Sequence, residues 1–229
     1  MNKKSKKSWI VWGIIILVIV VAVVLLLTVV NKKEETPVFQ TEGTTLIKYN
    51  GKEENVVIPG DITHIGKMAF QGNTKLKSVK TEKGSKLKTI GTGAFEKCSA
   101  LSTISFAEGL VEIGDYAFAN CTNLQTVVIG EKVEAINDET FTGSKSLTDV
   151  TFGASVKSIG GNVFASCNAF NKINYLGTAD DWSQIQIERT SYNPLSIEGV
   201  SLYIDGELAT IVSITNSPEI KDFVFIQQE

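Results

Sequence analysis

A short motif that recurs down the middle of the chain constrains its fold more than any other feature of the sequence. The motif reads Ile-Gly-x-x-Ala-Phe and occupies residues 65–70, 90–95 and 113–118, with a weaker copy at 136–141 and a fifth at 159–164. Its phenylalanines are separated by 25, 23, 23 and 23 residues. A fixed period of this size is typical of solenoids, in which each repeat forms one coil stacked on the previous coil. Such an architecture argues against a buried catalytic pocket.

Each repeat contains two local patterns, which are clearest between residues 110 and 130. The first places apolar side chains three and four residues apart, at Ala117, Cys121 and Leu124, which puts them on one face of a short helical turn. In the second, Val127 and Ile129 alternate with a period of two, as a half-buried strand requires. We therefore predict an α/β solenoid of about five 23-residue repeats. Its strands, at 76–81, 101–106, 124–129, 147–152 and 170–175, should form a parallel sheet.

The core should contain one continuous aromatic ladder, because no coil can bury its apolar stripe alone. Its members are Phe70, Phe95, Phe118, Phe141 and Phe164, and burying each phenyl group stabilises the fold by about 1.5–3 kcal/mol. The glycine after each isoleucine is expected to allow a tight turn or a positive φ. Asn137 replaces it in the fourth repeat, and asparagine tolerates left-handed backbone better than most residues.

The extended motif, Ile-Gly-x-x-Ala-Phe-x-x-Cys-x-x-Leu, resembles the BspA-like class of leucine-rich repeats (LRRs). The resemblance covers roughly residues 45–225, and the chain departs from it where Asn73 and Ser144 take the cysteine position. It implies a right-handed superhelix with a curved parallel sheet. It also implies a surface-exposed protein of the kind often linked to adhesion or host contact.

The segment before the first motif carries a hairpin signal. The dipeptide Asn50-Gly51 separates strands predicted at 46–49 and 56–58. Asn-Gly is the strongest two-residue hairpin signal, so we predict a hairpin that caps the first coil.

The segment after the last motif carries a second hairpin signal. Asp205-Gly206 separates strands predicted at 200–204 and 211–214. Residues 220–225 then repeat the spacing of the Ile-Gly-x-x-Ala-Phe motif. This partial repeat fits either a terminal cap or a truncated relative of a longer repeat protein.

Residues 9–30 form an uncharged run of 22 residues dominated by Ile, Val and Leu. As a helix this run rises roughly 33 Å, which matches a hydrocarbon core of about 30 Å. Lysines at positions 3, 4, 6 and 7 favour a cytoplasmic N-terminus, which places the repeats outside the membrane. The alternative is a cleaved signal peptide, although such a peptide has an apolar core of about 7–15 residues.

Charge excludes one class of partner. The chain has a formal net charge of −3, and residues 1–35 contribute +4 through six lysines and two glutamates, so residues 36–229 carry −7. An acidic folded part argues against nucleic-acid binding, which needs cations to displace the counterions of the phosphates.

Candidate catalytic and metal-binding groups are few. A zinc site or a Ser-His-Asp triad would depend on His64, the single histidine. Cys98, Cys121 and Cys167 occupy one phase of the repeat and fit small buried positions better than a metal site or a disulfide. We therefore expect no cofactor, no metal and no enzymatic activity. Trp182 should pack over the last coil rather than bind a ligand.

The outward positions of the predicted strands are the candidate binding residues, because solenoids commonly bind partners on the sheet face. These positions are small, polar and mixed in charge, without the Trp, Tyr or Arg anchors of strong interfaces. They could therefore form a contact surface or only a solvated face. They are Ser78, Lys80, Thr103, Ser105, Thr126, Val128, Asp149, Thr151, Lys172 and Asn174.

The sequence thus predicts a membrane-anchored surface protein in six parts. They are a cytoplasmic basic tail (1–8), a single transmembrane helix (9–30), a linker (31–44), the LRR solenoid with its hairpin cap (45–175), a connector (176–199), and a hairpin with a partial repeat (200–229). Its predicted function is non-enzymatic binding of a protein or cell-surface ligand. The alternatives are a structural spacer, or a remnant of a larger repeat protein without binding activity of its own. The oligomeric state stays open.

Overall fold

The computed structural model describes residues 38–106, 108–188, 199–211 and 225–226. The chain divides into two compact units, Met1–Pro37 and Val38–Glu229, and the repeats belong to the second. The predicted transmembrane helix (9–30) lies outside the described residues. Within the part that the structure describes, no helix is both long and apolar enough to span a bilayer.

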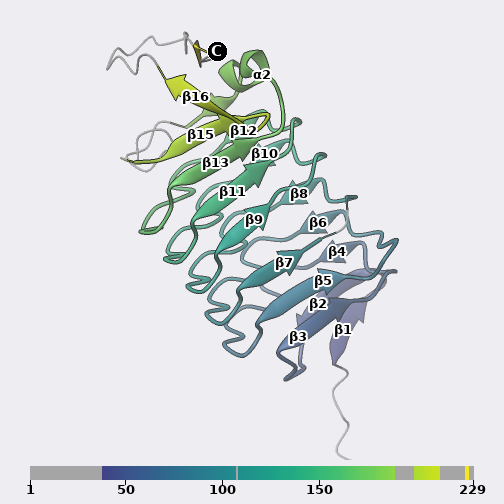
Figure 1. The fold of residues 1–229 in the computed structure, drawn as a ribbon. Helices are drawn as coiled ribbons and strands as arrows, with labels where there is room; N and C mark the ends of the chain where they lie inside the picture. Colours follow the sequence, from purple (N-terminus) through teal and green to yellow (C-terminus); the bar gives the residue numbers. More distant parts are fainter. Residues whose placement is uncertain (1–37, 107, 189–198, 212–224, 227–229) are drawn as a thin grey trace, which may run out of the picture. The chain divides into compact units, whose positions relative to one another are not determined.

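The coils stack through a front sheet of parallel strands, whose arrows all point the same way in Figure 1. This pairing confirms the parallel sheet and the strands predicted within it. The front strands are β3 (Asn55–Ile58), β5 (Ser78–Thr81), β7 (Thr103–Ser105), β9 (Thr126–Val128), β11 (Asp149–Phe152), β13 (Lys172–Tyr175) and β15 (Ser201–Ile204).

A rear sheet, which the sequence analysis missed, runs along the opposite side of the coils. Most of its strands contain only two residues, and in the repeats one of them is the buried isoleucine of the motif. Two residues are too few to show an alternating pattern. The rear strands are β2 (Thr45–Tyr49), β4 (His64–Ile65), β6 (Thr89–Ile90), β8 (Glu112–Ile113), β10 (Ala135–Ile136), β12 (Ser158–Ile159) and β14 (Gln186–Ile187).

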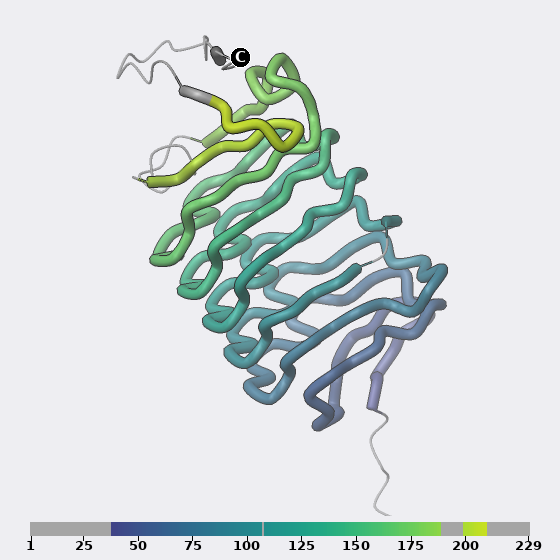
Figure 2. Tube along the Cα trace, viewed as in Figure 1, coloured from purple at the N-terminus to yellow at the C-terminus, as the bar shows by residue number. Residues whose placement is uncertain are grey.

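The segments between rear and front strands are turns, so the predicted helical segments are wrong and the fold is a β-solenoid (Figure 2). Among the described residues, the one helix is the five-residue α2 (Ala179–Ser183) after the last motif. In each motif the second and sixth residues after the glycine position adopt φ of 53–72°, and left-handed residues cannot continue an α-helix. They are Met68, Gly93, Tyr116, Glu139 and Asn162, then Gly72, Lys97, Asn120, Gly143 and Ser166.

Backbone hydrogen bonds link these turns from coil to coil in a turn ladder. The amide N–H of Phe95 donates to the carbonyl of Ala117 at 2.8 Å, and that of Phe118 donates to Thr140 at 2.9 Å. The amide of Phe141 donates in the same way to Val163 at 3.1 Å. The turns therefore satisfy their polar groups without forming a helix.

The motif glycines are required by close packing between coils rather than by positive φ, which corrects the expectation. None of Gly66, Gly91, Gly114 and Gly160 has a positive φ. A Cβ at Gly91 would lie 2.8 Å from the backbone nitrogen of Lys67, and one at Gly114 would lie 2.7 Å from that of Thr92. Both distances are far below van der Waals contact, so only glycine lets these coils approach.

Asn137, at the glycine position of the fourth repeat, also lacks a positive φ. Its side-chain amide donates to the carbonyl of Ile113 at 2.7 Å. At the other junctions that bond is made by a backbone amide, as when Gly114 donates to Ile90 at 2.8 Å. The inserted side chain coincides with an interruption of the rear sheet between β8 and β10.

The front sheet is interrupted at the same junction, between β7 and β9. We call this junction the seam. It joins the coil that carries β7 and β8 to the coil that carries β9 and β10. At the seam the turn ladder continues, through the hydrogen bond from Phe118 to Thr140. The strands on either side of the seam do not pair, in the front sheet or in the rear sheet.

The predicted aromatic ladder is confirmed. Its five phenylalanines are at most 2% exposed, and each ring stacks on the next with centroids 4.8–5.8 Å apart. Tyr49 extends the stack at the N-terminal end, 4.9 Å from Phe70, and Phe170 extends it beyond Phe164 at 4.1 Å. Trp182 is 1% exposed and packs edge-on against Tyr175, as expected of a residue that covers the last coil.

The N-terminal hairpin is not the one predicted. β2 pairs antiparallel with β1 (Phe39–Glu42), and it also pairs in parallel with β4. β3 belongs to the front sheet, where it pairs with β5. Asn50-Gly51 therefore connects a strand of the rear sheet to a strand of the front sheet within one coil. Both strands contribute to the core, since Leu46 and Ile58 are buried.

The C-terminal hairpin is confirmed around Asp205-Gly206, whose φ values of 48° and 85° suit a tight primed turn. Its second strand is β16 (Glu207–Ile211), which begins earlier than predicted and pairs antiparallel with β15. Residues 212–214 and most of the predicted partial repeat lie outside the described residues. The described part forms β17 (Phe225–Ile226), which pairs antiparallel with β16.

Candidate functional site

The outward side of the front sheet carries all ten candidate binding residues. None is buried, while the residues between them on the same strands face the core. Parallel register aligns them in two rows, each interrupted at the unpaired junction between β7 and β9. The first row is Asn55, Ser78, Thr103, Thr126, Asp149, Lys172 and Ser201, and the second is Val57, Lys80, Ser105, Val128, Thr151, Asn174 and Tyr203.

Few contacts join side chains along these rows. Ser78 donates to the Asn55 amide oxygen at 2.7 Å, and the Asn174 amide donates to the Thr151 hydroxyl at 3.4 Å. Among the described residues of the face, the hydroxyls of Thr103, Ser105 and Thr126 make no such bond, which suits adaptable polar contacts with a partner.

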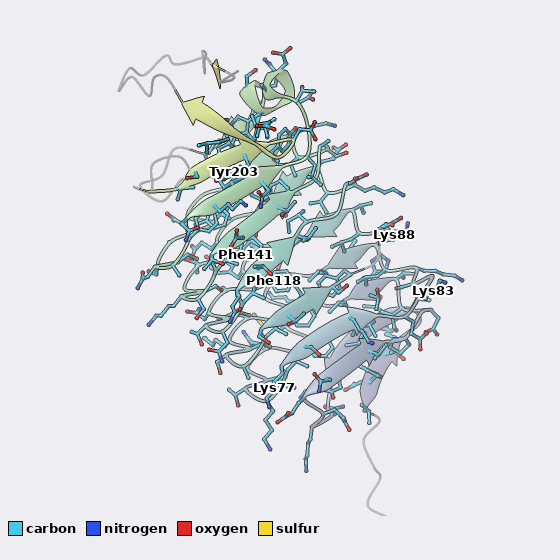
Figure 3. The ribbon with its side chains drawn as sticks, viewed as in Figure 1. Lys77, Lys83, Lys88, Phe118, Phe141 and Tyr203 are labelled. Carbon is cyan, nitrogen blue, oxygen red and sulfur yellow. The ribbon has the colours of Figure 1, made fainter. Side chains whose placement is uncertain are left out.

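Four residues of the face were not among the ten candidates, namely Asn55, Val57, Ser201 and Tyr203, and Tyr203 is the aromatic one. The Lys172 ammonium lies 4.4 Å from the centroid of its ring, which is a cation–π contact. Figure 3 labels Tyr203 near the C-terminal end of the stack. The sequence analysis assigned residues 200–204 to a separate hairpin, so Tyr203 was not counted on the sheet. The pairing of β15 with β13 puts it there and supplies an aromatic group that the face was expected to lack.

The seam exposes apolar groups beside the face. Val128 is 71% exposed, the most exposed large hydrophobic residue among those described. Ile104 on β7 is only partly buried, whereas the equivalent Val79, Val127 and Val150 are at most 2% exposed. A hollow with a volume of about 700 Å³ lies between the two strands and their following loops.

The three cysteines serve the packing of the coils. Cys98, Cys121 and Cys167 are free and buried, and each thiol donates to the carbonyl of a phenylalanine on the preceding coil at 3.1–3.2 Å. Burial raises the pKa of Cys98 and of Cys167 to about 12, and that of Cys121 well above its ordinary value. At neutral pH the three thiols therefore stay protonated and serve as weak hydrogen-bond donors. Because only a thiolate acts as a nucleophile or a metal ligand, these buried thiols do neither.

The remaining candidate groups do not form a reactive site. The Nδ1 atom of His64, on the rear sheet, shares a hydrogen bond with the Thr89 hydroxyl at 2.7 Å in an exposed position. Within the part of the chain that the structure describes, no three His, Cys, Asp or Glu side chains gather as a metal site. A binding surface on the front sheet is therefore the best-supported candidate site.

The chain belongs to the family of the BspA type leucine rich repeat region, whose sequence profile matches six copies over residues 46–171. Six copies correct the predicted five, because the segment that begins at Leu46 is itself a repeat. Proteins of this family and fold are generally non-enzymatic, and leucine-rich repeats commonly bind proteins.

Several solved structures share the fold. The leucine-rich repeat protein of T. pallidum is 30% identical with a TM-score of 0.57, over 62% of this chain and 71% of its own. A leucine-rich cell surface protein of Faecalibacterium prausnitzii is 30% identical with a TM-score of 0.60, over 66% of this chain and 41% of its own. The pneumococcal vaccine antigen PcpA is 21% identical with a TM-score of 0.59, over 72% of this chain and 40% of its own. At this identity the similarity supports a shared fold and nothing more. A comparison with curated proteins found no match.

Proposed function

We propose that this protein is a non-enzymatic surface protein that binds a protein or cell-surface ligand through the outer side of its front sheet. The observation that carries the proposal is the row that ends in Tyr203, in which an aromatic ring and the exposed Val128 flank small polar groups. Aromatic anchors surrounded by adaptable polar groups are typical of protein interfaces. The similarity to a cell surface protein of F. prausnitzii supports a surface location.

The proposal includes the membrane. Residues 9–30 anchor the chain as a single helix, with the N-terminus in the cytoplasm and the repeats outside. Protease added to intact cells should then digest the repeats, and alkaline carbonate should leave the protein in the membrane fraction. A mature protein whose mass lacks the first 30 or so residues would instead identify a cleaved signal peptide.

Attachment of cells that display the full chain tests the binding role. Wild-type cells should adhere to epithelial monolayers or to matrix-coated wells more than cells without the protein. Tyr203→Ser, and Lys80→Glu combined with Asp149→Lys, should reduce adhesion. Tyr116→Ser is the matched control, because Tyr116 is an exposed tyrosine on the turns, where its hydroxyl donates to Glu139 at 2.8 Å.

Two outcomes would contradict the proposal. Adhesion that both face variants leave unchanged would exclude the front sheet as the contact surface. Wild-type adhesion no greater than that of cells without the protein would favour a structural spacer.

A further inference from the structure

A groove follows one edge of the coils, where the front strands end. Three hollows of about 620, 700 and 660 Å³ lie along this edge. The first two share four lining residues, including Phe106, and the last two share Leu176. We call this continuous feature the edge groove. It extends from the end of β5 to the hairpin of β15 and β16, and Lys83 marks its β5 end in Figure 3.

The centre of the edge groove carries exposed apolar side chains, and two of them, Phe106 and Val128, border the unpaired junction of β7 and β9. Phe106 is only partly buried and meets the rings of Phe95 and Phe118 at 6.0 and 6.3 Å in tilted contacts. Val128 and Leu176, which are 71% and 48% exposed, complete this centre. Exposed apolar groups gathered in a hollow are typical of binding sites rather than of ordinary surface.

The two ends of the groove differ in charge. At the β5 end, Lys80, Lys83 and Lys132 accompany two glutamates. At the other end, the described residues that line the hollow include four carboxylates and neither a lysine nor an arginine. They are Asp180, Asp181, Asp205 and Glu207.

Three of these four carboxylates are available to a partner. Asp181 accepts hydrogen bonds from Thr178 within the α2 cap. Over the described residues, the ion pairs join Lys77 to Glu54, Lys97 to Glu96 and Lys157 to Glu134, so none of them neutralises this end. A cationic group would therefore find uncompensated negative charge there.

We propose that the edge groove binds an extended peptide segment with an apolar centre and a cationic end. The apolar residues lie at the seam against Phe106, Val128 and Leu176, and the cationic end lies against Asp180 and Glu207. The six front strands that border the groove span roughly 24 Å at about 4.8 Å per strand, which is the length of about seven extended residues. This groove adjoins the outer side of the front sheet and shares Lys80, Ser105 and Val128 with it. Leu176, Asp180 and Glu207 line the groove alone, so variants at these positions let either proposal fail without the other.

Peptide binding to the full chain in uncharged detergent tests this inference, with fluorescence anisotropy of a labelled probe as the readout. The probe is Lys-Lys-Ser-Leu-Val-Leu-Ser. One control peptide replaces both lysines with glutamate, and another replaces Leu-Val-Leu with Ser-Gly-Ser. We expect the probe to bind at least tenfold more tightly than either control, and its affinity should fall as salt rises from 50 to 500 mM because salt screens exposed charges.

Variants locate the binding on the groove. Leu176→Ser, and Asp180→Lys combined with Glu207→Lys, should each weaken probe binding at least tenfold. The matched controls lie on the rear sheet and should leave affinity unchanged. They are Ile47→Ser, at a 39% exposed position, and Glu112→Lys, at an exposed one. Circular dichroism melting verifies that every variant folds.

Three results would overturn the proposal. Equal affinity for all three peptides would show that the groove does not select this chemistry. Unchanged affinity in both groove variants would place the peptide elsewhere. A dimer by light scattering that Leu176→Ser converts to a monomer would identify the occupant as a second copy of this chain.

Discussion

Truncating Phe118 should separate the stack into two parts that unfold independently. Phe118 lies at the seam, where the front and rear sheets are both interrupted. Its ring stacks on Phe95 at 5.4 Å and, across the seam, on Phe141 at 5.8 Å (Figure 3). In a solenoid, stability is approximately the sum of coil and nearest-neighbour terms, so a junction without sheet pairing depends most on its core contacts.

The size of the effect follows from burial and stacking. Phe118 is 0% exposed, and removing a buried phenyl group loses about 1.5–3 kcal/mol of transfer free energy. Each of its two stacked pairs contributes about 0.5–1.5 kcal/mol more. We therefore expect Phe118→Ala to cost about 4 kcal/mol, within the range of about 3–5 kcal/mol for such substitutions. This is a large fraction of the 5–15 kcal/mol that stabilises an ordinary domain.

Hydrogen exchange followed by mass spectrometry on the full chain distinguishes two effects. One is a loss of coupling between the coils on the two sides of the seam, and the other is an equal loss of stability in all coils. In Phe118→Ala, amides in β3, β5 and β7 should exchange with a different opening free energy from those in β11 and β13. Phe70→Ala is the matched control, because Phe70 is also buried and stacked on both sides, on Tyr49 and Phe95, but its junctions keep both sheets. We expect Phe70→Ala to lower both groups together. If the two groups also exchange together in Phe118→Ala, the seam is no weaker than other junctions and the reasoning is wrong.

Two further substitutions test the packing between coils. Cys121→Ser should change the free energy of unfolding by less than about 1 kcal/mol, because Ser144 makes the same bond to a phenylalanine carbonyl at 2.9 Å. Cys121→Ala loses both side-chain volume and the donor, so it should cost roughly 1–2 kcal/mol. Urea titration measures both costs, and equal values would disprove a donor role for the thiol. Gly114→Ala should cost about 1–3 kcal/mol, because the new Cβ meets backbone that cannot move aside, while Gly130→Ala has open space and should be neutral or slightly stabilising. Equal melting temperatures for the two glycine variants would contradict the close-packing explanation.

The sequence analysis predicted the front strands and the aromatic ladder because both repeat in register along the chain. A period near 23 residues places equivalent side chains on one line of the stack, so the burial of Phe95 follows from that of Phe118. The same reasoning placed all ten candidate residues outside the core, as the structure does. Their role in binding stays a prediction.

The predicted N-terminal hairpin and the predicted helical segments were wrong because each depended on a local sequence pattern. In the folded chain, pairing with adjacent coils determines the conformation of these segments. Asn50-Gly51 has the composition of a hairpin turn, but the flanking strands find their partners in different sheets. The helical spacing after each motif is real, yet residues such as Met68 and Lys97 adopt left-handed backbone there because the turn ladder fixes them. The sequence places Tyr203 on a hairpin strand, and only the pairing of that strand with β13 brings it onto the face.

The repetition of the coils, the residues of their common core and the outward strand positions can all be read from the amino-acid sequence. These properties depend on periodicity and hydrophobicity, which are carried along a single chain. How successive coils meet is visible only in three dimensions: the close approach at Gly114, the Asn137 amide that takes the place of a backbone bond, and the seam that leaves Ile104 partly buried. Each of these depends on distances between residues some 23 positions apart, and a one-dimensional pattern does not contain such distances.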